Sequence, residues 1–251
     1  MSRRALILQE LGLLPLWVRR DRAAAKAPAL SAARAAPDPA TAVRPQQLVP
    51  TDERAARIAG MSWGELRASM QACTACGLHK ARKQAVPGVG DEQADWLFVG
   101  EGPGAEEDAR GEPFVGPAGR LLDNMLAAIG LRRGADVYIA NVVKCRPPNN
   151  RVPEPAEAVA CEPYLLRQIA LLRPRLIVAL GKTAACSLLC TEGTLASLRG
   201  RVRAFHGIPL LVTYHPAYLL RNPLDKARSW EDLCQARELM ARLKAGESVL
   251  T

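Results

Sequence analysis

Residues 96–108 read W-L-F-V-G-E-G-P-G-A-E-E-D, an apolar run that passes directly into a glycine-rich turn. Further apolar runs follow at residues 137–143, 176–180 and 210–213. The sequence between the runs favours helices, which we expect at residues 118–129, 155–172, 183–189 and 230–243. Short strands that alternate with helices indicate a parallel sheet covered on both faces. The sequence therefore predicts a three-layer α/β/α fold with a central, mainly parallel, four-stranded sheet.

The N-terminal part has a different composition from the rest of the chain. Residues 1–22 hold a short apolar stretch among basic residues, and residues 23–60 are rich in Ala, Pro and Arg with little apolar periodicity. Such a composition is typical of a disordered linker. We expect a main domain at residues 61–251, preceded by an arm that holds DNA non-specifically, is simply solvated, or docks a protein partner through a helix in residues 1–22.

Length, charge and cysteine content limit the class of protein. The 251 residues include no run near the roughly 20 apolar residues that a membrane span needs, so we expect no membrane protein. The net charge of +9 favours a polyanionic partner, and nucleic acid is the leading candidate. Seven cysteines and the lack of a signal-peptide pattern argue against an oxidising compartment. We therefore expect a reduced, cytoplasmic protein.

Four cysteines have a spacing typical of a metal site. Cys73 and Cys76 form a C-x2-C knuckle, and Cys145 and Cys161 follow far downstream. Zinc ribbons usually carry two such knuckles about 15–20 residues apart, a pattern that differs from this one. The spacing favours an iron–sulfur cluster and leaves zinc as the alternative.

Polar and glycine residues follow the predicted strands, where an open parallel sheet binds its ligand. The turn after residue 99 has Pro103 and lacks the third glycine of a dinucleotide fingerprint, although such a site and a plain turn stay open. Asn141 lies in an apolar strand and needs hydrogen-bond partners, which a ligand or the backbone can supply equally well. His215, stiffened by Pro216, is a candidate catalyst or anion stabiliser at the end of the last strand.

Four ordered segments carry a family resemblance. They are G-E-G-P-G-A-E-E-D from Gly100, G-E-P-F-V-G-P-A-G-R-L-L from Gly111, N-V-V-K-C-R-P-P-N-N-R from Asn141 and H-P-A-Y-L-L-R from His215. Together with the four cysteines, they resemble the iron–sulfur-containing family 4 of uracil-DNA glycosylases over about residues 73–243. The resemblance implies a DNA repair enzyme that flips uracil out of DNA and hydrolyses its N-glycosidic bond, which leaves an abasic site.

The resemblance also implies roles for residues of the pocket. Phe114 is expected to stack on the flipped uracil, and Asn141 to read its pyrimidine edge. His215 is expected to hydrogen-bond the uracil carbonyl as negative charge develops. Glu101 is assigned to water positioning or pocket organisation, with Glu107 as the second candidate. The pocket is expected to be lined by the backbone of Gly100, Gly102 and Gly104.

For the cofactor, the resemblance implies a 4Fe-4S cluster with a structural role on Cys73, Cys76, Cys145 and Cys161, with zinc as the alternative. The cluster would turn three basic residues toward the DNA backbone, namely Lys144, Arg146 and Arg151.

The segment after His215 resembles the wedge loop of the family. Leu219 and Leu220 are expected to fill the hole left by the flipped base, and Arg221 to grip phosphate. The alternative is that the two leucines only begin a hydrophobic helix.

Two other functions stay open for a chain with these motifs. One is a non-catalytic iron–sulfur module that binds damaged DNA. The other is covalent capture of uracil-DNA through a histidine in an inserted basic loop, which is disfavoured because no such insertion follows Arg151. We expect a monomer that acts on uracil-containing DNA.

Overall fold

The computed structural model describes residues 53–250. Within them, the sheet has strand order β1-β3-β2-β4-β6-β5. Its centre is formed by four mutually parallel strands, β2 (Trp96–Gly100), β3 (Val137–Asn141), β4 (Leu176–Leu180) and β6 (Ile208–Thr213). These are the four strands that the apolar runs predict, because central parallel strands are buried on both faces and read as continuous apolar segments.

The sheet has more strands than the sequence predicts. Two short antiparallel strands lie at its edges: β1 (Val89–Gly90) pairs with β3, and β5 (Arg203–Phe205) pairs with β6. The prediction of four strands is thus wrong in number, since the described residues form six. Segments of two and three residues are too short to give an apolar run. The strand predicted at residues 137–143 ends earlier than expected, at Asn141. The Val142 and Val143 N–H groups still bond to the Gly100 and Glu101 carbonyls.

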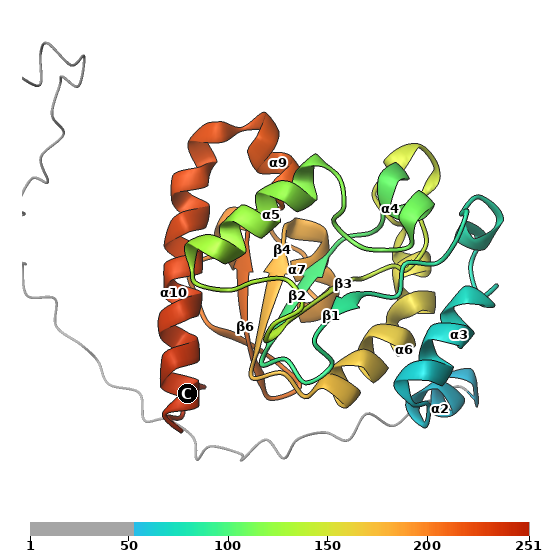
Figure 1. Ribbon diagram of the computed structural model, residues 1–251, viewed down its shortest axis with the longest axis horizontal. Helices are drawn as coiled ribbons and strands as arrows, with labels where there is room; N and C mark the ends of the chain where they lie inside the picture. Colours follow the sequence, from blue (N-terminus) through green and yellow to red (C-terminus); the bar gives the residue numbers. More distant parts are fainter. Residues whose placement is uncertain (1–52, 251) are drawn as a thin grey trace, which may run out of the picture. The chain divides into compact units, whose positions relative to one another are not determined.

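Helices cover both faces of the sheet (Figure 1). One face packs against α5 (Pro117–Ala128), α9 (Pro216–Arg221) and α10 (Lys226–Lys244). The other packs against α6 (Pro155–Leu172), α7 (Lys182–Leu189) and α8 (Leu195–Leu198). Because alternate residues of a strand point to opposite faces, Trp96 and Phe98 enter the first core, and Leu97 and Val99 the second. The three-layer prediction is confirmed.

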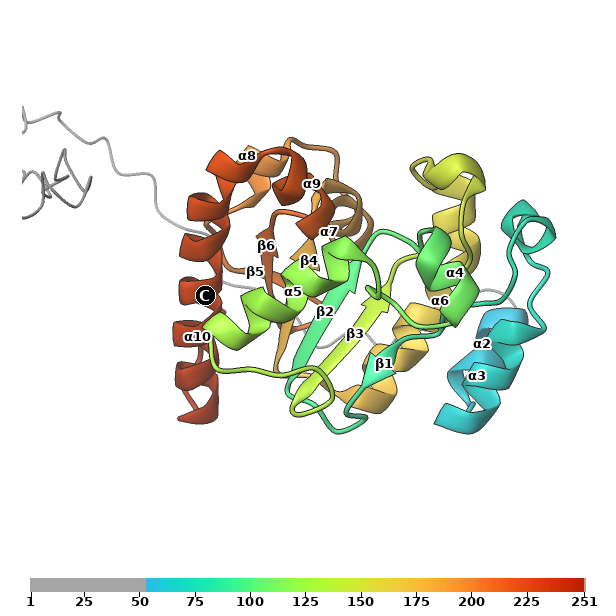
Figure 2. The ribbon, with the colours of Figure 1, turned by 45° about the horizontal axis from the view of Figure 1, so that its top comes forward.

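Shorter helices complete the described part of the chain. The N-terminal pair, α2 (Glu53–Ala59) and α3 (Trp63–Gln71), packs beside α6 (Figure 2). The helix α4 (Ala105–Arg110) follows the glycine-rich turn, and three 3-10 turns occur at η1 (Gly77–Lys80), η2 (Pro148–Asn150) and η3 (Pro223–Asp225). None of the helices within residues 53–250 is long and apolar enough to cross a bilayer.

The end of the expected linker is folded. Although residues 23–60 are predicted to be disordered, α2 buries Ile58 to 1% exposure. Its Arg54 donates a hydrogen bond to the Ala160 carbonyl of α6 at 3.0 Å. One buried isoleucine and one arginine tie this helix to the core, a signal too sparse to appear as apolar periodicity. The segment of residues 1–22 and the remainder of the linker lie outside the described residues.

Candidate active site and metal centre

The carboxyl ends of the parallel strands meet at one edge of the sheet, around a cavity of about 460 Å³. Ligands of open α/β sheets bind at this edge. Each of the four strands contributes to the wall through its last residue or the loop that follows it. The cavity brings together most of the pocket residues predicted from the sequence, namely Glu101, Gly102, Gly104, Phe114, Asn141 and His215.

Asn141 ends β3 with its side chain at the cavity. The residue is 2% exposed, and its Oδ1 atom finds no hydrogen-bond partner within residues 53–250. An unpaired buried acceptor costs about 1–3 kcal/mol. The sequence left open whether a ligand or the backbone bonds this side chain, and the backbone of the described residues does not bond its oxygen. A ligand N–H group is the partner that the position is suited to bind.

Gly100 allows this amide to lie close to an aromatic ring. A Cβ atom at Gly100 would lie 2.5 Å from Asn141 Oδ1 and 2.6 Å from Phe114 Cζ, so any larger residue would displace both groups. Phe114 itself has a left-handed backbone, with φ of 57°, which turns the chain back toward the cavity before α5 begins. The glycine, the amide and the ring form one wall.

His215 directly follows β6, and its ring lies close to that of Phe114, with ring centroids 5.5 Å apart. Its Nδ1 accepts a hydrogen bond from the Ala217 N–H at 3.2 Å, as N-cap of α9. Burial lowers the pKa of His215 to about 4, with a further lowering by Arg221 and an opposing effect of Glu107. At neutral pH the imidazole is therefore uncharged, and the proton lies on Nε2 because Nδ1 is an acceptor. The site thus presents a neutral donor.

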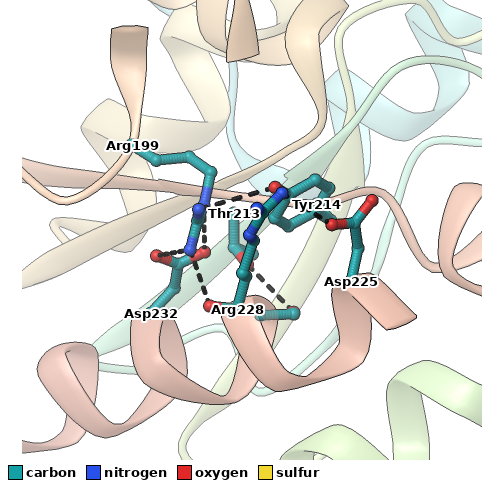
Figure 3. A network of polar contacts seen from close by, with 7 residues as sticks. Arg199, Thr213, Tyr214, Asp225, Arg228 and Asp232 are labelled. Carbon is teal, nitrogen blue, oxygen red and sulfur yellow. Dashed lines mark hydrogen bonds and ion pairs between the residues drawn. The ribbon is translucent and has the colours of Figure 1, made fainter. Parts of the chain in front are cut away.

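A polar network joins Arg199 and Asp232 to Tyr214, the residue that precedes His215 in the chain (Figure 3). The Arg199 guanidinium lies 4.7 Å from the centroid of the Tyr214 ring, and the nearly parallel Tyr218 ring lies 5.5 Å from the same centroid. Arg199 also donates two hydrogen bonds to Asp232 of α10, at 2.9 and 2.8 Å. This network fixes the main chain at the end of β6, and sequence reasoning missed it because its residues are far apart in the chain.

Glu107 connects the glycine-rich turn after β2 to the loop that carries Phe114. Its Oε2 atom accepts the Gly104 N–H at 3.1 Å, and its Oε1 atom accepts the N–H groups of Val115 and Gly116 at 3.1 and 3.3 Å. The second acidic candidate from the sequence is therefore engaged with backbone donors. Glu101 lies on the cavity wall.

The loop after β4 also lines the cavity, which the sequence reading missed. Gly181, Lys182 and Thr183 come from this loop and from the start of α7. Gly181 has φ of 91°, and a Cβ atom there would lie 2.9 Å from His215 Cβ. The run Leu176–Leu180 followed by glycine was the available signal, since every parallel strand ends at this edge.

The four predicted metal ligands surround a second, small cavity. Cys73 and Cys76 come from the turn between α3 and η1, Cys145 follows β3, and Cys161 lies in α6. N–H donors point at three of the sulfur atoms: Arg82 Nη1 at 2.8 Å from Cys145, the Lys144 N–H at 3.3 Å from Cys161, and Arg54 Nη2 at 3.6 Å from Cys73. Four cysteines with cationic and N–H donors suit an anionic iron–sulfur group.

The spacing of these side chains bears on the kind of metal. Among residues 53–250, no three Cys, His, Asp or Glu side chains lie close enough to share one metal ion. A single tetrahedral zinc requires that closeness, whereas each cysteine of a four-iron cluster binds a different iron.

Residues 87–234 match the family model described as the Uracil DNA glycosylase superfamily. The chain belongs to this superfamily. Within it, the chain belongs with type 4: it is 46% identical to the type-4 uracil-DNA glycosylase of Pyrobaculum aerophilum over 181 residues, which cover 69% of this chain and 92% of that protein. It is also 46% identical to the type-4 enzyme of Thermotoga maritima, over 68% of this chain and 90% of that protein. A type-5 uracil-DNA glycosylase of Thermus thermophilus is 37% identical over 52% of this chain and 68% of that protein.

Two of the predicted DNA contacts in this superfamily member are wrong. Lys144 is 1% exposed and donates to the Asn141 carbonyl and to Gln168 Oε1, both at 2.6 Å, so it does not face phosphate. Burial lowers its pKa to about 8. Leu219 is 1% exposed in the core between α9 and the sheet, so it is no wedge. Both predictions failed because packing of α6 and α9, invisible in the motif, decides which way each side chain points.

The remaining basic and apolar candidates of this glycosylase lie at the surface. Arg221 is exposed at the cavity rim, and Leu220 is 44% exposed. Arg151 lines the same cavity and forms a two-bond ion pair with Glu157, at 2.7 and 2.8 Å. Arg146 donates to Asn150 Oδ1 at 2.7 Å. These four residues keep their place as candidate DNA contacts.

Proposed function

We propose that this type-4 glycosylase removes uracil from DNA by hydrolysing the N-glycosidic bond, and that the residues of the large cavity perform the reaction. The observation that carries the proposal is the unpaired, buried Oδ1 atom of Asn141, which faces a cavity shared with Phe114 and His215. The names of the relatives support the same activity. The product is an abasic site, as needed at the start of base excision repair.

Base recognition follows from the chemistry of the wall. Because a duplex hides the glycosidic bond, uracil must rotate out of the helix before it enters the cavity. Phe114 offers an aromatic face for stacking. Asn141 can accept the N3–H group of uracil and donate to O4, whereas cytosine presents an acceptor at N3 and a donor at C4. The backbone of Gly100, Gly102 and Gly104 lets the base approach this wall closely.

The chemical step leaves uracil as an anion and the sugar as an oxocarbenium-like cation. Groups that are pre-placed to donate to the developing anion lower the barrier. The Nε2–H group of neutral His215 is proposed as such a donor, to a carbonyl oxygen of uracil. Glu101 is proposed to orient the attacking water from the cavity wall. Glu107 is proposed to organise the pocket, since its carboxylate already holds two loops.

DNA contacts are proposed at the rim of the cavity. Leu220, which is exposed, replaces Leu219 as the side chain that fills the space left by the flipped base. Arg221, Arg146 and Arg151 are proposed to contact phosphates, which position DNA without reading its sequence. Lys182 at the start of α7 extends this basic rim.

The four cysteines are proposed to hold a 4Fe-4S cluster. When bound, this group cross-links the knuckle of Cys73 and Cys76 to Cys145 and Cys161, a structural task. Because it needs reduced thiols, we propose that the enzyme acts in the cytoplasm. We also propose that it is a monomer and that its catalytic domain includes α2, which begins before the residue 61 boundary that the sequence predicts.

The test is excision by iron-loaded protein on an oligonucleotide with a U:G pair, under single-turnover conditions. Alkali-cleavable product, with free uracil released in equal amount, supports the proposal. Tight binding without product would instead indicate a non-catalytic damage-binding module. A protein–DNA adduct that survives denaturation would indicate covalent capture.

A further inference from the structure

Arg133, in the loop between α5 and β3, holds the main chain of the segment that carries Phe114. Its Nη1 atom donates to the Pro113 carbonyl and its Nη2 atom to the Phe114 carbonyl, each at 2.9 Å. Its Nε atom donates to Asp123 Oδ1 of α5 at 3.0 Å. A guanidinium carries its donors in a rigid, planar fork. Here the fork spans two consecutive carbonyls, and the ion pair with α5 keeps it turned toward them.

The peptide unit between Phe114 and Val115 is held by a charged group at each end. Its carbonyl accepts the Arg133 hydrogen bond, and its N–H group donates to Glu107 Oε1 at 3.1 Å. The carboxylate belongs to α4 and the guanidinium to the loop after α5, so two elements that are separate in the chain fix one peptide. Hydrogen bonds with an ionised partner are stronger than those between neutral groups. Rotation of this peptide would break both bonds.

The backbone of Phe114 needs such support. Its φ of 57° lies in the left-handed region, which a residue with a side chain keeps only where the surrounding structure fixes it. Gly119 leaves room for the turn, because a Cβ atom there would lie 1.7 Å from the Phe114 carbonyl oxygen. With an ordinary, negative φ, the side chain would leave the main chain in another direction. The place of the ring beside His215 therefore depends on this conformation.

We propose that Arg133 is a positioning residue for uracil recognition: its guanidinium holds the Phe114 main chain in the conformation that presents the aromatic face to the flipped base. This inference rests on the proposed function. Arg133 does not line the large cavity, so it acts on the base through Phe114. It also lies outside the four segments that carry the family resemblance.

The first test uses Arg133→Met, which keeps an apolar stem and removes all the donors. Free uracil is the probe because it has no phosphate, so a changed attraction for DNA does not enter its inhibition constant. Inhibition by uracil should weaken about tenfold, the effect of losing a hydrogen bond from a charged donor, with the far-UV spectrum unchanged. The matched control is Arg132→Met, which removes the same charge from the exposed neighbour and should leave inhibition unchanged. Equal inhibition of the two folded variants would overturn the inference.

A second test asks whether Arg133 acts through the ring. In the wild-type background, Arg133→Met should slow single-turnover excision about tenfold. In a Phe114→Leu background, which lacks the aromatic face, the same change should slow excision less than twofold, because its effect is already lost. A residue that only stabilises the domain predicts equal slowing in both backgrounds, and that outcome would overturn the inference.

The two proposals fail in different ways. If wild-type protein neither binds uracil nor excises it from DNA, the proposed function is wrong. If wild-type protein does both and folded Arg133→Met does both equally well, only the role of Arg133 is wrong.

Discussion

The carboxylate of Glu107 accepts the main-chain N–H of Gly104 at 3.1 Å, while its other oxygen holds the loop that carries Phe114. One side chain thus fixes the glycine-rich turn against the aromatic wall. Hydrogen bonds to a charged acceptor are each worth about 1.5–3 kcal/mol. The distance between these loops, and with it the width of the cavity, depends on this residue.

Glu107→Gln should disturb that arrangement. The NH2 group of the glutamine would face either the Gly104 N–H or the loop N–H groups on the other side, and it cannot accept a hydrogen bond from them. We expect the free energy of unfolding to fall by about 1.5–3 kcal/mol and single-turnover uracil excision to slow about tenfold. Glu106→Gln serves as the control, because it removes the same charge from the preceding residue of α4, which is exposed. Equal behaviour of the two variants would show that the loop contacts are dispensable.

The strands of the sheet illustrate what the sequence can predict. β2 and β4 are buried on both faces, so their apolar runs identify them without any tertiary information. The edge strands β1 and β5 are stabilised by pairing with a neighbour, and two or three residues carry no pattern.

Side-chain direction is the part of the site that the motifs leave open. His215 and Asn141 were found because a parallel sheet brings its strand ends together, whereas Phe114 was found only through the family resemblance. Leu219 and Leu220 differ by one position on α9, yet one is buried and the other is exposed. Only the packing of that helix against the sheet distinguishes them.

The protonation of His215 gives a prediction in two parts. His215→Ala should slow excision about 100- to 1,000-fold, as for the loss of one donor to a developing anion, without loss of folding. The pKa of His215 is lowered to about 4 from an ordinary value near 6.5, so the unfolded chain binds more protons between these values. The free energy of unfolding should therefore fall as pH decreases from about 6.5 to 4. In His215→Gln, this part of the pH dependence should be absent.

Asn141→Leu should separate stability from function. Leucine has nearly the shape of asparagine and removes the unpaired Oδ1 atom, so the free energy of unfolding should rise by about 1 kcal/mol or more. Binding of free uracil should weaken at least about tenfold, because the base loses its hydrogen-bond partner. Urea unfolding and uracil inhibition measure the two effects. A large loss of stability would mean that the amide has a structural partner.

The ion pair of Arg199 and Asp232 gives a test of buried charge (Figure 3). Burial raises the pKa of Asp232, an effect that Arg199 opposes. Arg199→Met leaves the carboxylate without its partner and should cost about 3–5 kcal/mol of unfolding free energy. The double variant Arg199→Met, Asp232→Leu should recover most of this loss, as measured by urea unfolding of the complete double-mutant cycle. Additive losses would show that the two residues act independently.

Cys145→Ala tests the metal centre through iron content and stability together. Cys145 lines the small cavity together with Cys73, Cys76 and Cys161, so its loss would remove one ligand of the proposed cluster. We expect the brown colour and bound iron to disappear and Tm to fall by about 6–12 °C, the shift that a loss of about 3 kcal/mol causes in a domain of this size. Cys190→Ala, at the exposed end of α7, should change neither iron content nor Tm. Because a metal that binds only the folded chain stabilises it, the two losses should also appear together when wild-type protein is treated with chelator. Full iron content in Cys145→Ala would exclude this residue as a ligand, and with it the four-cysteine assignment.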